Sequence, residues 1–135
     1  MKIFIYYVGK PRDAALNAYA AEFVKRASRY GPCEMREIEP AKFEIPKRHP
    51  GARRIYLDPA GKTLASAAFA ELFDDPRDLV FLIGAHAGLT DEQRGEADRL
   101  LSLSPMTFSH ELARAILAEQ IFRAFAIRNN HPYVR

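Results

Sequence analysis

The strongest constraint on the fold is an almost unbroken apolar run near the middle of the chain, "DLVFLIG" at residues 78–84. A strand with one face in water alternates apolar and polar residues, whereas a strand covered on both faces is apolar throughout. The run has the length of a strand and ends at Gly84. We therefore expect the central strand of a parallel sheet, with helices covering both faces of that sheet.

Segments typical of strands and of helices alternate along the rest of the chain. We expect further strands at 2–8, at 33–39 (polar and near a sheet edge), at 53–58 (closed by the turn "DPAGK") and at 101–104. Expected helices run from Asp13 to Tyr30 with Asp13 as cap, from a Thr63 cap to Phe73, from a Thr90 cap onward, and from Ser109 to Ile127. Residues 40–52 contain too many prolines for a long helix. This alternation indicates an α/β fold with a parallel sheet, which we expect to be a single domain over residues 1–135.

The composition, 48% hydrophobic and 27% charged residues, is that of an ordinary globular protein. The single Cys33 excludes an internal disulfide. The sequence also contains neither a membrane-length apolar run nor a signal-peptide pattern, so we expect a cytoplasmic protein without a membrane partner.

The formal net charge of +3 is compatible with a polyanionic partner. Basic residues gather in "PKRHPGARR" (46–54) and in the C-terminal "RNNHPYVR", although either segment could equally be an ordinary solvated one.

Several common chemistries lack their sequence motifs here. The glycines of "GAHAG" (84–88) follow the central strand, but the chain has neither the G-x-G-x-x-G pattern of dinucleotide sites nor a phosphate loop that ends in Gly-Lys-Ser/Thr. A G-x-S-x-G nucleophile elbow is also missing. The four histidines and Cys33 do not have metal-ligand spacing, so we expect no metal site.

The remaining candidates for a binding site follow three of the expected strands. They are "YLD" (56–58), "LIGAHAG" (82–88) and "LSLSPMTFSH" (101–110), the last a turn without glycine that contains two bulky apolar residues, Met106 and Phe108. The carboxyl ends of parallel strands meet at one edge of a sheet, where open α/β folds bind their ligands. A slot with apolar walls and many backbone amides suits a flat heteroaromatic ring such as adenine.

The same segments carry a family resemblance. The run "FLIGAHAGL", followed by "SLSPMTFSHELARAILAEQIFRAFAIRNNHPY", resembles the small methyltransferases that modify N3 of a pseudouridine in 23S ribosomal RNA, members of the SPOUT superfamily. "RIYLDPAGK" and "KIFIYYVGK" fit as well, so the resemblance covers nearly the whole chain. It implies an α/β domain with a C-terminal trefoil knot that holds S-adenosylmethionine. Matched by motif, the cofactor-binding residues would be Leu57, Gly84, Leu103, Ser104, Pro105, Met106, Thr107 and Phe108.

The resemblance also implies a reaction. The N3–H of pseudouridine lies between two carbonyls and is weakly acidic, so the enzyme must position N3 in line with the methyl group and remove the proton or stabilise the anion. The catalytic candidates are His110, Arg123, Tyr133 and Arg135, with His131 beside them in the tail. Each has a structural alternative: Arg123 could simply pair with Glu119, His110 could be a helix-start residue, and the tail could be frayed.

The chain departs from the family pattern at several positions. Ala85 replaces a glycine, His86 and Ala87 stand where a proline and an acidic residue are common, Ser109 and Glu111 replace prolines that flank the histidine, and Val134 replaces a second histidine of the tail. The segment between the second and third strands is also shorter than in many relatives. Gly84→Val is expected to weaken donor binding and leave the fold intact. Deletion of 131–135, which offers little apolar area, is expected to stop methyl transfer and barely change the melting temperature.

The expected partners are 23S ribosomal RNA within the assembled ribosome and a second copy of the chain. The homodimer is predicted because the last helix is apolar on more than one face, with Ile121 a suspected contact; the alternative is a helix sandwiched within its own fold. Two other functions remain open: a SPOUT methyltransferase for another RNA position, and a catalytically silent α/β module that binds RNA or ribosomes. Specific affinity for S-adenosylmethionine separates the enzymes from the silent module.

Overall fold

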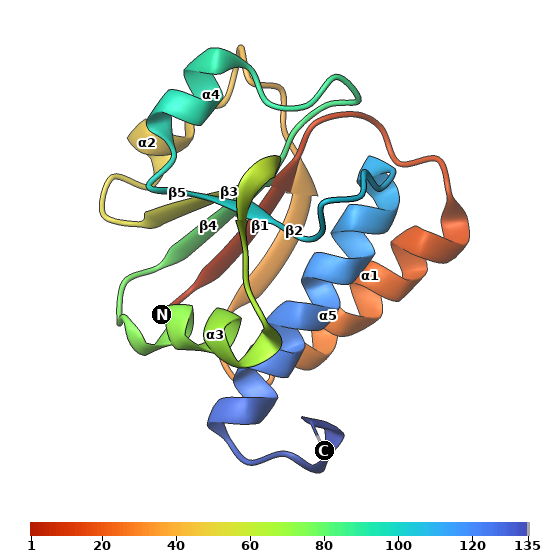
Figure 1. The fold of residues 1–135 in the computed structure, drawn as a ribbon, viewed down its shortest axis with the longest axis vertical. Coiled ribbons are helices and arrows are strands. Elements are labelled where there is room, and N and C mark those ends of the chain that lie inside the picture. Colours follow the sequence, from red (N-terminus) through yellow and green to blue (C-terminus); the bar gives the residue numbers. More distant parts are fainter. Residues whose placement is uncertain (135) are drawn as a thin grey trace.

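The computed structural model describes residues 1–134, and its apolar run forms the middle strand of a five-stranded sheet (Figure 1). The sheet order is β2-β1-β4-β3-β5, and all neighbouring strands are parallel. The strands are β1 (Ile3–Tyr7), β2 (Cys33–Glu37), β3 (Arg53–Thr63), β4 (Leu79–Ile83) and β5 (Arg99–Ser102). Every residue of β4 is buried, and the polar β2 lies at an edge, as predicted. The predicted parallel α/β sheet is confirmed.

Helical segments cover both faces of this sheet. They are α1 (Ala14–Ala27), α2 (Ile45–Arg48), α3 (Ser66–Glu71), α4 (Asp91–Glu96) and α5 (His110–Arg128), with short 3-10 turns at η1 (Leu72–Asp74) and η2 (Pro132–Val134). On one face α1, α3 and α5 pack over a large apolar cluster that includes Ile5 and Phe81. On the other face Tyr6, Tyr56 and Leu82 pack with the segment that contains α2. The alternate residues of each strand therefore point into two separate cores.

Three predicted helix starts are confirmed by their hydrogen bonds. The Asp13 side chain accepts from the Leu16 amide at 3.0 Å, and the Ser109 hydroxyl accepts from the Leu112 amide at 3.3 Å. Thr90 forms a capping box with Gln93, in which each side chain accepts a hydrogen bond from the backbone amide of the other residue. These caps satisfy amides that have no partner inside their helices.

The predicted strand end at "DPAGK" is wrong, and so is the Thr63 cap. β3 continues to Thr63, and both Leu57 and Lys62 pair with Leu101 of β5, so that residues 58–61 form a bulge within the strand. A bulge adds residues to one strand without ending it, which the turn-forming residue types alone do not distinguish from a turn. Thr63 pairs with Ser102, and the first residue before α3 is Ala65, which has no side-chain hydrogen bond to the helix.

The predictions for the last strand and the last helix also need correction. β5 begins at Arg99, two residues before the predicted start, because it pairs with β3 from Ile55 onward. Ile121 has an exposed fraction of 0%, so it is a core residue of this chain and not a surface contact. α5 packs against α1 and α3 as well as the sheet, which accounts for its several apolar faces within one chain. The homodimer stays a prediction, without this argument in its support.

None of the helices within residues 1–134 is both long and apolar enough to span a membrane.

Candidate cofactor and catalytic site

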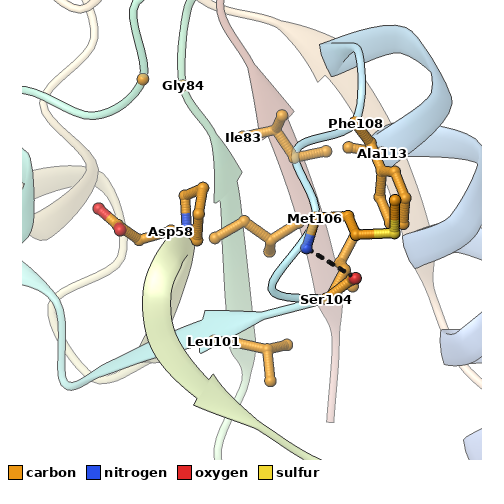
Figure 2. A pocket seen from close by; sticks show the side chains of 12 residues that line it. Asp58, Ile83, Gly84, Leu101, Ser104, Met106, Phe108 and Ala113 are labelled. Carbon is orange, nitrogen blue, oxygen red and sulfur yellow. Dashed lines mark hydrogen bonds between the residues drawn. The ribbon is translucent and has the colours of Figure 1, made fainter.

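A pocket of about 120 Å³ opens beside the bulge of β3 and the carboxyl ends of β4 and β5 (Figure 2). Six of the eight residues predicted to bind the cofactor line it: Leu57, Gly84, Leu103, Ser104, Met106 and Phe108. Pro105 and Thr107 belong to the same loop but do not line the pocket. The lining also includes six residues that were not among the predicted cofactor contacts: Asp58, Pro59, Ile83, Gly88, Leu101 and Ala113. Four of these lie within the three segments expected to form the site, and Pro59 directly follows one of them, whereas Ala113 becomes part of the pocket only because α5 returns to the sheet.

Serine hydroxyls give the loop after β5 its shape. The Ser102 hydroxyl donates to the Ser104 carbonyl at 2.8 Å, and the Ser104 hydroxyl accepts from the Met106 amide at 3.0 Å (Figure 2). Such local bonds fold a turn without glycine. They leave Met106 with 74% of its surface exposed at the pocket. A large apolar side chain held in water beside an apolar pocket is available to cover a ligand.

A tight turn forms the opposite wall. The Gly88 amide donates to the Ala85 carbonyl at 2.7 Å, and Gly88 has a φ of +89°, which side chains other than glycine rarely adopt. A Cβ atom on Gly84 would lie 2.8 Å from the carbonyl carbon of Gly88. The prediction that Gly84→Val leaves the fold intact is therefore wrong, because the added side chain would displace the turn itself.

Asp58 provides a buried carboxylate at the edge of the pocket. It is 5% exposed, accepts from the Arg94 guanidinium at 2.7 Å and from the Ala60 amide at 2.8 Å. Burial by itself would raise the pKa of Asp58, but the bonds from Ala60 and Arg94 outweigh it and the pKa is lowered. Asp58 is thus an ionised anchor that ties the β3 bulge to α4.

The structure separates the predicted catalytic residues into two groups. His110 begins α5, two residues after the pocket residue Phe108, and its ring centroid is 6.4 Å from that of His86. Arg123 lies ten residues beyond Ala113 on the same helix, a rise of about 15 Å. Arg135 lies outside the described residues. Within one chain, His110 is therefore next to the pocket and Arg123 is not.

Arg123 and Tyr133 form a network at the far end of α5. Arg123 pairs with Glu119 at 2.9 Å, which is the structural alternative considered for it, and its guanidinium lies 4.8 Å from the centre of the Tyr133 ring. The Tyr133 hydroxyl donates to Glu119 at 3.2 Å, and its ring packs edge-on against Phe122 and Phe23. The expectation that the tail buries little apolar area is therefore wrong for Tyr133.

The basic segment 46–54 does not form one continuous positive surface. Arg53 and Arg54 pair with acidic residues, and Lys47 pairs with Glu44 at 2.8 Å. Arg48 instead stacks on Phe43, with its guanidinium 4.9 Å from the ring centre, and Arg36 of β2 stacks on the same ring at 4.9 Å. Both arginines are exposed, and neither forms an ion pair within residues 1–134. We call Arg36, Phe43 and Arg48 the arginine clamp.

Comparison with known proteins places the chain in a family. Residues 1–133 match the family model described as "Predicted SPOUT methyltransferase". The chain is 57% identical to the ribosomal RNA large subunit methyltransferase H of Solibacter usitatus, with both chains covered in full. It is 35% identical to a protein of the same name from Thermus thermophilus, over 100% of this chain and 99% of the relative.

Solved structures show the same fold at low sequence identity. A probable methylase family protein from Haemophilus influenzae superposes with a TM-score of 0.68 at 13% identity, over 95% of this chain and 68% of that one. The SpoU methyltransferase AviRb from Streptomyces viridochromogenes, in complex with AdoMet, superposes with a TM-score of 0.54 at 13% identity, over 90% of this chain and 57% of that one. Together with the family model and the full-length relatives, these observations show that the chain belongs to the SPOUT methyltransferases, in the family of ribosomal RNA large subunit methyltransferase H.

Proposed function

We propose that this chain transfers the methyl group of S-adenosylmethionine to N3 of a pseudouridine in 23S ribosomal RNA. The observation that carries the proposal is the apolar pocket beside the β3 bulge and the carboxyl ends of β4 and β5, built from the segments that match the family. The names of the full-length relatives support ribosomal RNA as the substrate. The specific base comes from the sequence resemblance.

The pocket is suited to the donor's nucleoside. Apolar side chains from β3, β5 and the loop after β5, among them Leu57, Leu101 and Phe108, provide walls for a flat ring. We expect backbone groups of the loops after β4 and β5 to supply the hydrogen bonds to that ring. When bound, S-adenosylmethionine supplies an already activated methyl group, so the protein's contribution is to hold the donor, exclude water and orient the RNA base.

A homodimer would bring the second group of candidates to the reaction. Arg123 and Tyr133 lie far from the pocket of their own chain, so we infer that they, with Arg135, serve the pocket of a partner subunit. Aromatic and arginine side chains of this kind stack on unpaired bases and contact phosphates. We further infer, from family membership, that the C-terminal third forms a trefoil knot, and that the single-domain chain acts on assembled ribosomes in the cytoplasm.

Methyl transfer to intact ribosomes tests the function. The protein is incubated with labelled S-adenosylmethionine and ribosomes that lack the modification, and the methylated base is then mapped. Label at N3 of one pseudouridine in 23S RNA is the expected result. Label at another RNA position would replace the proposed substrate, and donor binding too weak to detect by calorimetry would favour the silent RNA-binding module.

A further inference from the structure

We propose that Glu119 is a positioning residue of the methyltransferase, whose carboxylate holds the Arg123 guanidinium and the Tyr133 ring in the arrangement that contacts the acceptor RNA. The inference rests on the proposed function, which it deepens by naming the residue through which these two RNA contacts are fixed. Its starting point is one carboxylate on which side chains from α1, from α5 and from the C-terminal turn η2 converge.

Both carboxylate oxygens of Glu119 accept hydrogen bonds. The Tyr19 hydroxyl of α1 donates to Oε1 at 3.0 Å. Oε2 accepts from Nε of Arg123 at 3.0 Å and from the Tyr133 hydroxyl at 3.2 Å, and Nη2 of Arg123 lies 2.9 Å from the same oxygen. The guanidinium also lies 4.8 Å from the centre of the Tyr133 ring. One carboxylate therefore fixes both the direction of the guanidinium and the place of the ring.

An ordinary ion pair on α1 shows how this differs from a simple helix contact. Nε of Arg26 donates to Glu22 at 3.1 Å, with the same spacing of four residues, and the Arg26 guanidinium also lies over an aromatic ring, 5.0 Å from the centre of Phe23. Within residues 1–134 the Glu22 carboxylate accepts no other hydrogen bond. The Glu119 side chain is only 21% exposed and has partners on three elements. A pair that only supports its helix does not require these further partners.

The network keeps Glu119 ionised. Burial by itself would raise the pKa of Glu119, but the hydrogen bonds from Tyr19 and Arg123 outweigh it and the pKa is lowered. The carboxylate therefore remains charged at neutral pH, and its attraction for the guanidinium persists while the enzyme works. Hydrogen bonds between charged groups are stronger and more directional than those between neutral ones.

The bonds to Glu119 leave part of the Arg123 guanidinium available. Within residues 1–134 the two N–H groups of Nη1 have no hydrogen-bond partner, and the side chain is 33% exposed. An arginine side chain that is already held in one position loses less conformational entropy when it binds than a free one does. A fixed guanidinium with unused donors suits the phosphates of RNA or the carbonyls of a pyrimidine base.

Tyr19 extends the network to a second helix. Its ring packs on Phe23 with 4.9 Å between the centroids, and its hydroxyl occupies the carboxylate oxygen that Arg123 does not use. This bond holds the Glu119 side chain from α1 and so limits its rotation. Tyr19 is therefore expected to affect the reaction through Glu119, by a smaller amount than Glu119 itself.

The test measures kcat/KM for methylation of unmodified ribosomes, at a temperature well below the lowest Tm of the variants. Glu119→Ala should lower kcat/KM at least about tenfold, since misplacing a contact by about 1 Å can cost about 100-fold. Glu119→Gln should retain more of the activity, because its amide oxygen can accept from Arg123 and its NH₂ group can donate to the Tyr19 hydroxyl. Glu22→Ala removes the ordinary pair and should keep the wild-type value. All three variants should bind S-adenosylmethionine normally by calorimetry.

A double-mutant cycle tests whether Glu119 acts through Arg123. Arg123→Met removes the guanidinium, and long single-turnover time courses with labelled donor measure its residual rate. In this background Glu119→Ala should cost at most about threefold, far less than in the wild-type background. Tyr19→Phe, which keeps the ring and removes the hydroxyl, should cost about threefold in the wild-type protein and nothing further in Glu119→Ala.

Failure of the proposed function and failure of this inference give different results. Wild-type protein that binds donor but does not methylate ribosomes would show that the substrate is wrong, and the positioning role would fall with it. If the wild-type protein is active and Glu119→Ala stays within about threefold of it, the pair with Arg123 is only structural.

Three further results would also overturn the positioning role. An Arg123→Met variant with near wild-type activity would leave Glu119 no RNA contact to position. Equal losses from Glu119→Ala with and without Arg123 would mean that the two residues act independently. A donor affinity that falls in Glu119→Ala would trace the loss of activity to a disturbed pocket.

Discussion

The carboxylate of Glu111 accepts a hydrogen bond from the backbone amide of Arg12 at 2.5 Å, although the two residues are 99 positions apart in the chain. The same carboxylate accepts from the Asp13 amide at 3.1 Å and from the Asn17 side chain at 3.1 Å. Glu111 thus joins the first turn of α5, which carries the pocket residue Ala113, to the start of α1. These hydrogen bonds hold one wall of the pocket against the rest of the fold.

This link predicts how stability depends on pH. The amides of Arg12 and Asp13 lower the pKa of Glu111 to about 2, below the value of about 4.3 for an unfolded glutamate. A lowered pKa contributes stability that is present above the unfolded value and lost as the pH falls through the folded one. Glu111→Gln should therefore lower Tm by a few degrees at pH 7, and the difference should shrink between about pH 4.5 and pH 2. Thermal melts across this range measure the difference, with Glu22→Gln as the control, since within residues 1–134 Glu22 pairs only with Arg26 on the exposed side of α1.

Met106 offers a test of donor binding that does not disturb the fold. Met106→Asp should raise the donor Kd at least about tenfold, since burial of a methionine side chain stabilises a complex by about 1.5–3 kcal/mol and a factor of ten corresponds to about 1.4 kcal/mol. Thr107→Asp places the same charge on the next residue, which does not line the pocket, and should bind donor normally. Calorimetry with S-adenosylmethionine compares the two. Equal affinities would contradict the assignment of this loop to the pocket.

The bulge in β3 depends on a glycine. A Cβ atom on Gly61 would lie 2.6 Å from both the carbonyl carbon and the carbonyl oxygen of Leu100, so Gly61→Ala must push β3 and β5 apart. We expect a loss of about 2 kcal/mol or more in the free energy of unfolding, as for other strained backbone sites. Gly51, whose Cβ would have no neighbour within 4 Å, provides the matched control Gly51→Ala. Urea denaturation that gives both variants the same midpoint would refute this argument.

The arginine clamp predicts a contact with RNA away from the donor pocket. Stacking on Phe43 holds the guanidinium groups of Arg36 and Arg48 in place, with their N–H donors available to phosphates. Acidic residues are also nearby, since Lys47 and Lys42 pair with Glu44 and Glu39. The double substitution Arg36→Gln with Arg48→Gln should raise KM for ribosomes. It should also reduce the slope of the logarithm of the binding constant against the logarithm of salt concentration by the amount that corresponds to about two phosphate contacts. Donor affinity should not change, and an unaltered salt dependence would show that the clamp is structural.

Local sequence patterns predicted the sheet and most of the residues that gather around the pocket, because both follow from short segments. The buried strand at β4, the caps Asp13 and Thr90 and the strand-end loops each depend on a few adjacent residues. The errors arose where distant segments decide the outcome. Leu101 pairs with both Leu57 and Lys62, so an expected turn is a bulge, and Ile121 is buried in the core of a helix that packs against α1 and α3. Distant segments also decide the burial of Arg114. It is fully buried with its guanidinium 3.7 Å from the centre of the Tyr7 ring, although an arginine in a helix is expected to be exposed.

The tail is the last element to test, because it has both a structural and a proposed catalytic role. Deletion of residues 131–135 should now lower Tm as well as stop methyl transfer, since it removes the Tyr133 ring from its contacts with Phe23 and Phe122. Tyr133→Phe keeps the ring and removes only the hydroxyl that donates to Glu119. This variant should melt close to the wild-type temperature, within the range of single hydrogen bonds. A large fall in its methylation rate would then report on RNA and not on the fold.

Mixed dimers decide which pocket the tail serves. One chain carries Met106→Asp, which impairs the pocket, and the other carries the deletion of 131–135, which removes the tail. If the tail completes the partner's pocket, each mixed dimer contains one site with an intact pocket and an intact tail, whereas neither parent homodimer contains any. Co-expression should therefore restore methyl transfer to ribosomes, measured per mixed dimer isolated with two different affinity tags. Activity no higher than that of the parent homodimers would place the tail and the pocket of each site in the same chain. A wild-type protein that sediments as a monomer at micromolar concentration would exclude the dimer altogether.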